Sequence, residues 1–236
     1  MAHRRALAPV RAPSADDLTA DLVGIGILVG GEGSRDPNIE DTLVFASAEG
    51  MEHDDLRVLS TLVTWFGVHL GRVNADRLTR LVALQESRRV RAFWSALAHW
   101  RASDRRFARL GRGYRGPRVD LLPIGTDFQV ERHGEDARFA RTSLRVPANA
   151  LRDRPADVLS PAELAGSHGP YRWRLVIGPA YRADMWAALE QEPSLSPSAL
   201  ARATYGSFAT AWQVKRDFEV WRHRPRSRMV RVPSSS

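Results

Sequence analysis

The sequence predicts a mostly α protein with a small β-containing middle segment, on three observations. Apolar residues recur at three- and four-residue intervals between residues 14 and 110, as at Leu56, Leu59 and Val63. This is the periodicity of an amphipathic helix. Residues that commonly cap helices precede most of these stretches. The chain of 236 residues is 43% hydrophobic, which is enough for a sizeable buried core and excludes wholesale disorder.

The first domain, residues 14–110, is predicted to contain five helices. The expected starts of these helices are Ser14, which forms a capping box with Asp17, then Asp36-Pro37, Asp54 or Asp55, Asn74, and Ser87. The short connections favour antiparallel neighbours. Residues 1–13 are rich in Arg, Ala and Pro and contain no long apolar run. They are expected to form a disordered basic arm and not a secretory signal.

The middle region, residues 111–168, has a different pattern. Gly111–Pro117 interrupts the helical periodicity. Asp127–Arg132 and Phe139–Val146 show partial two-residue alternation on either side of His133–Asp136, which predicts a β-hairpin. Ser160-Pro161-Ala162-Glu163 predicts one further helix start. We expect the main domain boundary at Gly166–Pro170.

The last domain, residues 169–232, is predicted to combine three helices with two flanking strands. The expected elements are a strand at Arg172–Ile177, helices at Ala180–Gln191 and Pro197–Ala203, a longer helix from Ser207 to about Trp221, and a strand at Arg228–Val232. Pro193 ends the first of these helices, and Ser196 caps the second. The two strands are expected to pair with each other.

The stretch Leu195–Val214 carries a family resemblance. A helix-turn-helix needs a small residue where its helices cross, and Ala201 is placed there. Its turn needs a residue that tolerates a positive φ, which Gly206 provides. The inner face of its second helix needs small or branched apolar residues, as at Ala211 and Val214. With the expected strands, this order resembles the winged helix-turn-helix superfamily.

Residues 172–184 strengthen this resemblance. The Arg172-x-Arg174 pair, Gly178 and Arg182-Ala183-Asp184 are similar to the entry of winged-helix domains in bacterial regulators, some of them encoded beside nucleotidyltransferase toxins. The resemblance covers about a quarter of the chain, and residues 1–170 show none. It completes the predicted fold: an N-terminal helical domain, a small β-containing middle segment and a C-terminal winged helix.

The resemblance implies that the helix beginning at Ser207 enters the major groove of DNA. Gln side chains can bind adenine, and Arg side chains can bind guanine or phosphate. The expected DNA-binding residues are Ser207, Ala209, Trp212, Gln213, Lys215, Arg216, Arg222, Arg224 and Arg226. An alternative is a protein-interaction module, because Phe208 and Trp212 together suit an apolar interface.

The charge distribution also favours a polyanionic partner. Residues 1–86 contain eight Arg and 13 Asp and Glu, whereas the rest of the chain is strongly basic. The acidic helical domain is therefore expected to mediate homodimerisation or to bind a protein partner. A second nucleic-acid patch is expected at Arg105, Arg109, Arg112, Tyr114 and Arg115. The alternative for this patch is a solvated linker.

Several kinds of chemistry are not expected. The chain has no cysteine, which excludes disulfides and thiolate metal sites and favours a reducing cytoplasm. Gly33-Ser34 and Glu40-Asp41 resemble a nucleotidyltransferase signature, but Leu43 stands where the second metal-binding carboxylate is needed. We therefore expect no enzyme activity, catalytic residue, metal or cofactor. The longest apolar run, Leu22–Val29, is too short to cross a membrane.

These observations predict a cytoplasmic, bacterial DNA-binding protein whose partner is double-stranded DNA. The expected role is that of a transcriptional regulator or an antitoxin-like repressor. Two alternatives remain open at this point. One is a winged-helix scaffold or interaction subunit of a multi-protein bacterial complex, and the other is an RNA-binding accessory protein.

Overall fold

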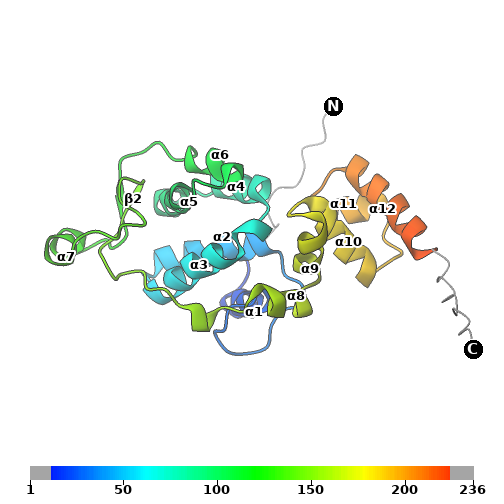
Figure 1. Ribbon diagram of the computed structural model, residues 1–236, viewed down its shortest axis with the longest axis horizontal. Coiled ribbons are helices and arrows are strands. Elements are labelled where there is room, and N and C mark those ends of the chain that lie inside the picture. Colours follow the sequence, from blue (N-terminus) through cyan, green and yellow to red (C-terminus); the bar gives the residue numbers. More distant parts are fainter. Residues whose placement is uncertain (1–11, 224–236) are drawn as a thin grey trace, which may run out of the picture.

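The computed structural model describes residues 12–223. Within this range the chain forms twelve α-helices and one small two-stranded sheet (Figure 1). The prediction of a mostly α fold is therefore confirmed. The expected N-terminal arm falls almost wholly outside the described residues. The expected strand Arg228–Val232 also lies outside them.

The first six helices pack around one large hydrophobic cluster. They are α1 Ala15–Gly24, α2 Ile39–Glu52, α3 Leu56–His69, α4 Ala75–Ala83, α5 Arg88–Trp100 and α6 Ala108–Gly111. The described part of the chain also contains three single-turn 3₁₀ helices, namely η1 Leu70–Arg72, η2 Arg105–Phe107 and η3 Pro155–Asp157. Helix α2 contacts α1, α3, α4 and α5, and so it lies at the centre of this helical part.

The predicted helix starts are largely confirmed. Ser14 forms the expected capping box, and Asp55, Asn74 and Ser87 each accept a backbone N–H in the first turn of α3, α4 and α5. The prediction for α2 is wrong, because Asn38 caps this helix in place of Asp36-Pro37. Asp36 has a φ of 52°, and its carboxylate accepts the N–H of Gly169 at 2.6 Å. A contact 133 residues away along the chain therefore holds Asp36 outside the helix.

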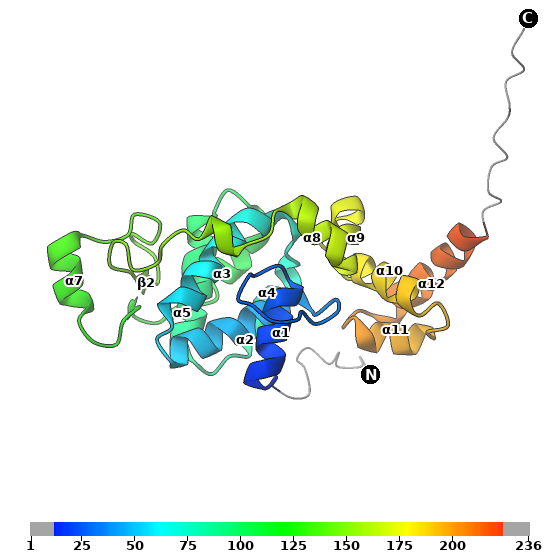
Figure 2. The same ribbon diagram turned by 90° about the horizontal axis from the view of Figure 1, so that it is seen from below.

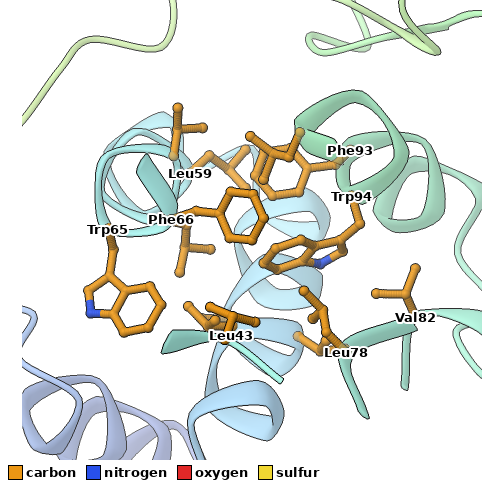
Figure 3. Close-up of a cluster of buried hydrophobic side chains, with 14 of the residues drawn as sticks. Leu43, Leu59, Trp65, Phe66, Leu78, Val82, Phe93 and Trp94 are labelled. Carbon is orange, nitrogen blue, oxygen red and sulfur yellow. The ribbon is translucent and has the colours of Figure 1, made fainter. Parts of the chain in front are cut away.

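Aromatic side chains from α3 and α5 fill the middle of the large cluster (Figure 3). The rings of Phe66 and Trp94 meet edge to face with their centres 5.6 Å apart, which is a favourable geometry for aromatic pairs. The indole N–H of Trp94 donates to Ser47 Oγ, and that of Trp65 donates to the Ile25 carbonyl, each at 2.8 Å. Both indoles are thus fully buried without an unsatisfied donor.

The hairpin predicted in the middle region is wrong. Residues expected to form its first strand lie in helix α7, Thr126–His133. The sheet consists of β1, Val119–Asp120, and β2, Leu144–Arg145, which pair in parallel with Val119 opposite Leu144. Gly125 and Gly134, with φ values of 84° and 80°, flank α7. Gly125 stands at the N-cap and Gly134 at the C-cap of α7, so glycines bound the helix at both ends.

Two helices connect this region to the C-terminal part. Helix α8, Pro161–Ser167, has the expected capping box of Ser160 and Glu163. Helix α9, Gly169–Ile177, replaces the strand predicted at Arg172–Ile177, and this prediction is wrong. His168 caps α9 by accepting the N–H of Tyr171 at 2.9 Å. Tyr171 and Arg174 are both buried; they are three residues apart, so they share a face only on a helix.

The C-terminal part consists of α10, Tyr181–Gln191, α11, Pro197–Ala203, and α12, Phe208–Arg222. These helices agree closely with the three predicted ones. They lie at one end of the molecule, and α7 lies at the opposite end (Figure 2). Among the described helices, none is long and apolar enough to cross a membrane.

Candidate nucleic-acid interface

Helices α10, α11 and α12 form a three-helix unit with a hydrophobic core of its own. The buried members of this core are Met185, Leu189, Leu200, Ala211, Val214 and Phe218. Ala211 and Val214 lie on the inner face of α12, as predicted. In α11 the fully buried residue is Leu200, and Ala201 is half-buried against the edge of the same core. An ion pair between Arg182 and Asp217, 3.0 Å long, joins α10 to α12 on the surface.

The turn between α11 and α12 spans residues 204–207, and its geometry differs from the expectation. Tyr205, not Gly206, has the positive φ, at 58°. A Cβ atom at Gly206 would meet Cε of Met185, so the flexible and fully buried Met185 side chain would have to shift. The glycine therefore leaves room for the end of the Met185 side chain in the core of the three-helix unit. Ser207 then caps α12 by accepting the N–H of Thr210 at 3.1 Å.

One face of α12 is open to solvent. Phe208 and Trp212 are 57% and 47% exposed, and Ala209, Gln213 and Arg216 are also exposed. The guanidinium carbon of Arg216 lies 4.7 Å from the centre of the Trp212 ring. This stacking orders both side chains along the helix. Four of the predicted DNA-binding residues, Ala209, Trp212, Gln213 and Arg216, thus share an exposed face.

Other predicted site residues are placed differently. The Ser207 hydroxyl is occupied by its capping bonds. Lys215 is half-buried, and its Nζ donates to the Pro193 carbonyl in the loop after α10. Arg222 is exposed at the far end of α12, 6.0 Å from the Phe218 ring. Arg224 and Arg226 lie outside the described residues.

The second predicted patch lies on η2, α6 and the following loop. Arg105, Arg109, Arg112 and Arg115 are all exposed. Tyr114 is half-buried and donates its hydroxyl hydrogen to the Pro117 carbonyl at 2.8 Å. Its ring lies directly over Gly116, where a Cβ atom would not fit. The arginines are therefore accessible to an anion, whereas the tyrosine ring is held within its own loop.

The turn of the three-helix unit is attached to the N-terminal helices through Arg77 on α4. The Arg77 guanidinium stacks on the Tyr205 ring, donates to Asn38 at 3.1 Å and forms an ion pair with Asp41. Burial raises the pKa of the Asp41 carboxyl above its ordinary value, although the charge of Arg77 opposes this effect. The contact fixes the turn that precedes α12 against α2 and α4.

A second attachment is fully buried. Arg174 on α9 forms a bidentate pair with Glu40 on α2, at 2.6 and 2.9 Å. It also forms one with Asp184 on α10, at 2.9 and 3.0 Å. Burial alone would lower the pKa of Arg174, but the charges of Asp184 and Glu40 outweigh it and raise that pKa. Breaking such a pair inside a protein leaves an uncompensated charge, so this cluster holds the two parts of the chain together.

Sequence reasoning missed these connecting residues. Glu40 and Asp41 were considered only as weak metal-binding candidates, and their carboxylates are instead paired with buried arginines. The pattern around them is that of an ordinary helix start. Their partners lie 134 and 36 residues away, so no local signal could have identified them.

The described residues contain no group of three or more His, Asp or Glu side chains that could hold a metal ion. Comparisons of the chain with protein-family models, curated proteins and solved structures found no match.

Proposed function

We propose that this protein binds double-stranded DNA through α11 and α12, with the start of α12 in the major groove. The observation that carries the proposal is the exposed face of α12 formed by Ala209, Trp212, Gln213 and Arg216. Helices α11 and α12 are joined by a short turn, and we infer that they act as a helix-turn-helix, in which the second helix reads base edges with the residues near its start. Gln213 and Arg216 supply the side-chain types that bind adenine and guanine.

The attachment of the unit supports this proposal. The turn before α12 is fixed by Arg77, and the preceding helices are fixed by Arg174. A reading helix on a rigid support loses less conformational entropy on binding than one on a mobile tether. We further propose that the protein acts as a transcriptional regulator or antitoxin-like repressor, whose acidic N-terminal helices contact a second copy or another protein.

The test begins with selection of duplexes from a randomised pool by the full-length protein. Anisotropy titrations then compare the enriched sequence with a scrambled one. Gln213→Ala or Arg216→Ala should weaken binding of the enriched duplex by about 1–3 kcal/mol and leave binding of the scrambled duplex nearly unchanged. Arg132→Ala, at an exposed position on α7, is the matched control. Absence of any duplex binding at low salt would exclude the proposal.

A second candidate function is a protein-interaction module. It is favoured by the exposure of Phe208 and Trp212 on the same face of α12, since aromatic residues dominate the energy of many interfaces. In this case Trp212→Ala would abolish a protein complex, Gln213→Ala would change it little, and the duplex selection would enrich no sequence.

A further inference from the structure

A pocket between α4, α5 and α6 is lined by an excess of positively charged side chains. Its volume is about 490 Å³, within the range of small-molecule sites. Its lining includes five arginines, Arg80, Arg91, Arg109, Arg112 and Arg115. No described Asp or Glu residue is among the lining side chains. We propose that this pocket binds a phosphate-bearing small molecule of the nucleotide class.

Four of the five pocket arginines, Arg91, Arg109, Arg112 and Arg115, form no ion pair with any residue that the structure describes. Only Arg80 has an ion pair within residues 12–223, to Asp76 at 3.0 Å. The Nε atom of Arg91 is buried without any hydrogen-bond acceptor among the described residues. A buried guanidinium N–H without an acceptor is costly. Like charges around a concave surface also focus a strong positive potential. Both features favour binding of an anion in this pocket.

The local backbone directs these arginines to the pocket. Helix α6 ends in a tight turn in which the Gly113 N–H donates to the Leu110 carbonyl at 2.9 Å. A Cβ atom on Gly113 would lie only 3.0 Å from that carbonyl oxygen, so the turn favours glycine. Arg109 lies in α6, and Arg112 and Arg115 follow this helix. The turn brings all three arginines to the lining of the same pocket. Their planar guanidinium groups match phosphate oxygens in bidentate fashion.

The apolar part of the lining narrows the ligand class. Val82 and Leu84 of the α4 region and Leu110 of α6 line the same pocket, and Leu84 is 54% exposed. A purely inorganic anion would leave this surface in water. A nucleotide presents phosphates to the arginines and a flat base to the leucines. A single-stranded nucleic acid also carries phosphates and bases. The experiment below therefore compares a free nucleotide with such a strand.

The inference is independent of the proposed DNA binding, because the pocket contains no residue of α11 or α12. Its test is calorimetric titration of the full-length protein with ATP, tripolyphosphate and adenosine at low salt, and with a single-stranded 20-mer. ATP should bind most tightly, tripolyphosphate more weakly and adenosine most weakly. The 20-mer should not compete with ATP at equal phosphate concentration.

The variants make the test specific. Arg109→Ala and Arg112→Ala, both at exposed positions, should each weaken ATP binding about 10-fold or more, as expected for loss of a charged hydrogen bond. Arg91→Met should also weaken ATP binding, and the melting temperature of this variant checks that it is folded. Arg132→Ala should change ATP affinity less than twofold. The inference would be overturned if the protein did not bind ATP, or if it bound the 20-mer but not ATP. It would also be overturned if Arg132→Ala lowered the affinity for ATP as much as the variants of the pocket arginines do.

Discussion

The guanidinium carbon of Arg77 lies 3.5 Å from the centre of the Tyr205 ring. This contact joins the fourth helix of the N-terminal part to the turn that precedes α12. Arg77 is 1% exposed, so the stacking is protected from water, where cation–π contacts are strongest. Together with the buried cluster of Arg174, Glu40 and Asp184, this stacking fixes the position of α12 relative to the N-terminal helices.

Loss of the Tyr205 ring should destabilise the protein. Asn tolerates a positive φ, so Tyr205→Asn removes the ring without adding backbone strain. We expect it to lower the free energy of unfolding by about 2 kcal/mol, the order of a desolvated cation–π contact. Tyr205→Phe keeps the ring and should cost less. Urea denaturation measures both, and equal stability of Tyr205→Asn and wild type would refute the role of the contact.

Gly206→Ala should destabilise the three-helix unit slightly, because the new Cβ meets Cε of Met185, whose flexible but fully buried side chain then has to repack. Overpacking that a flexible side chain can partly relieve falls at the low end of the usual cost, about 1 kcal/mol. Gly166 on α8 provides the control, since a Cβ there meets no atom within 4 Å. Gly166→Ala should be neutral or slightly stabilising, in line with helix propensity. Thermal melting of both variants checks the difference, and identical midpoints would contradict the prediction.

The buried pair of Arg174 and Glu40 should be far more sensitive than an exposed pair. Glu40→Gln removes a charge at a position that is 0% exposed and should cost about 3–5 kcal/mol. Asp217→Asn breaks the exposed pair with Arg182 and should cost less than about 1 kcal/mol. Denaturant titration compares them. Similar losses in the two variants would show that Arg174 does not depend on Glu40.

Acid should weaken the fold through His69. Its Nδ1 accepts the Tyr171 hydroxyl at 2.7 Å, and its Nε2–H donates to the Leu159 carbonyl at 3.1 Å. Burial lowers the pKa of His69 from 6.5 to about 4. Between pH 6.5 and pH 4, His69 is therefore protonated in the unfolded chain but neutral in the folded protein. This contribution to stability is full above pH 6.5 and is lost as the pH falls towards 4, by up to about 3 kcal/mol.

Urea denaturation between pH 7 and pH 4 measures this dependence. His69→Gln, which cannot be protonated, should be less stable than wild type at pH 7 and should lose less stability on acidification. His168 has a lowered pKa for the same reason, burial, so some slope should remain in the variant. An unchanged slope in His69→Gln would assign the whole acid effect to other groups.

The sequence by itself determined where most helices begin. Ser14, Asn74, Ser87 and Ser207 cap their helices through contacts within three residues, and such contacts are visible in any local stretch of sequence. Helices α11 and α12 follow from the same local rule, because Ser196 and Ser207 cap them, whereas α10 begins at Ala180 without a side-chain cap. These local caps are why α11 and α12 agree with prediction almost residue for residue.

Only the tertiary structure decided the state of residues 172–177 and the connection between the two parts. A short alternating segment is compatible with a strand or a helix, and burial against other elements chooses between them. Tyr171 and Arg174 are buried against α2 and α3 through His69 and Glu40, which requires a helix. Tyr171 and His69 are 102 residues apart, and Arg174 and Glu40 are 134 apart. Partners this distant leave no local pattern, so neither this helix nor the pair of Arg174 with Glu40 could be derived from spacing alone.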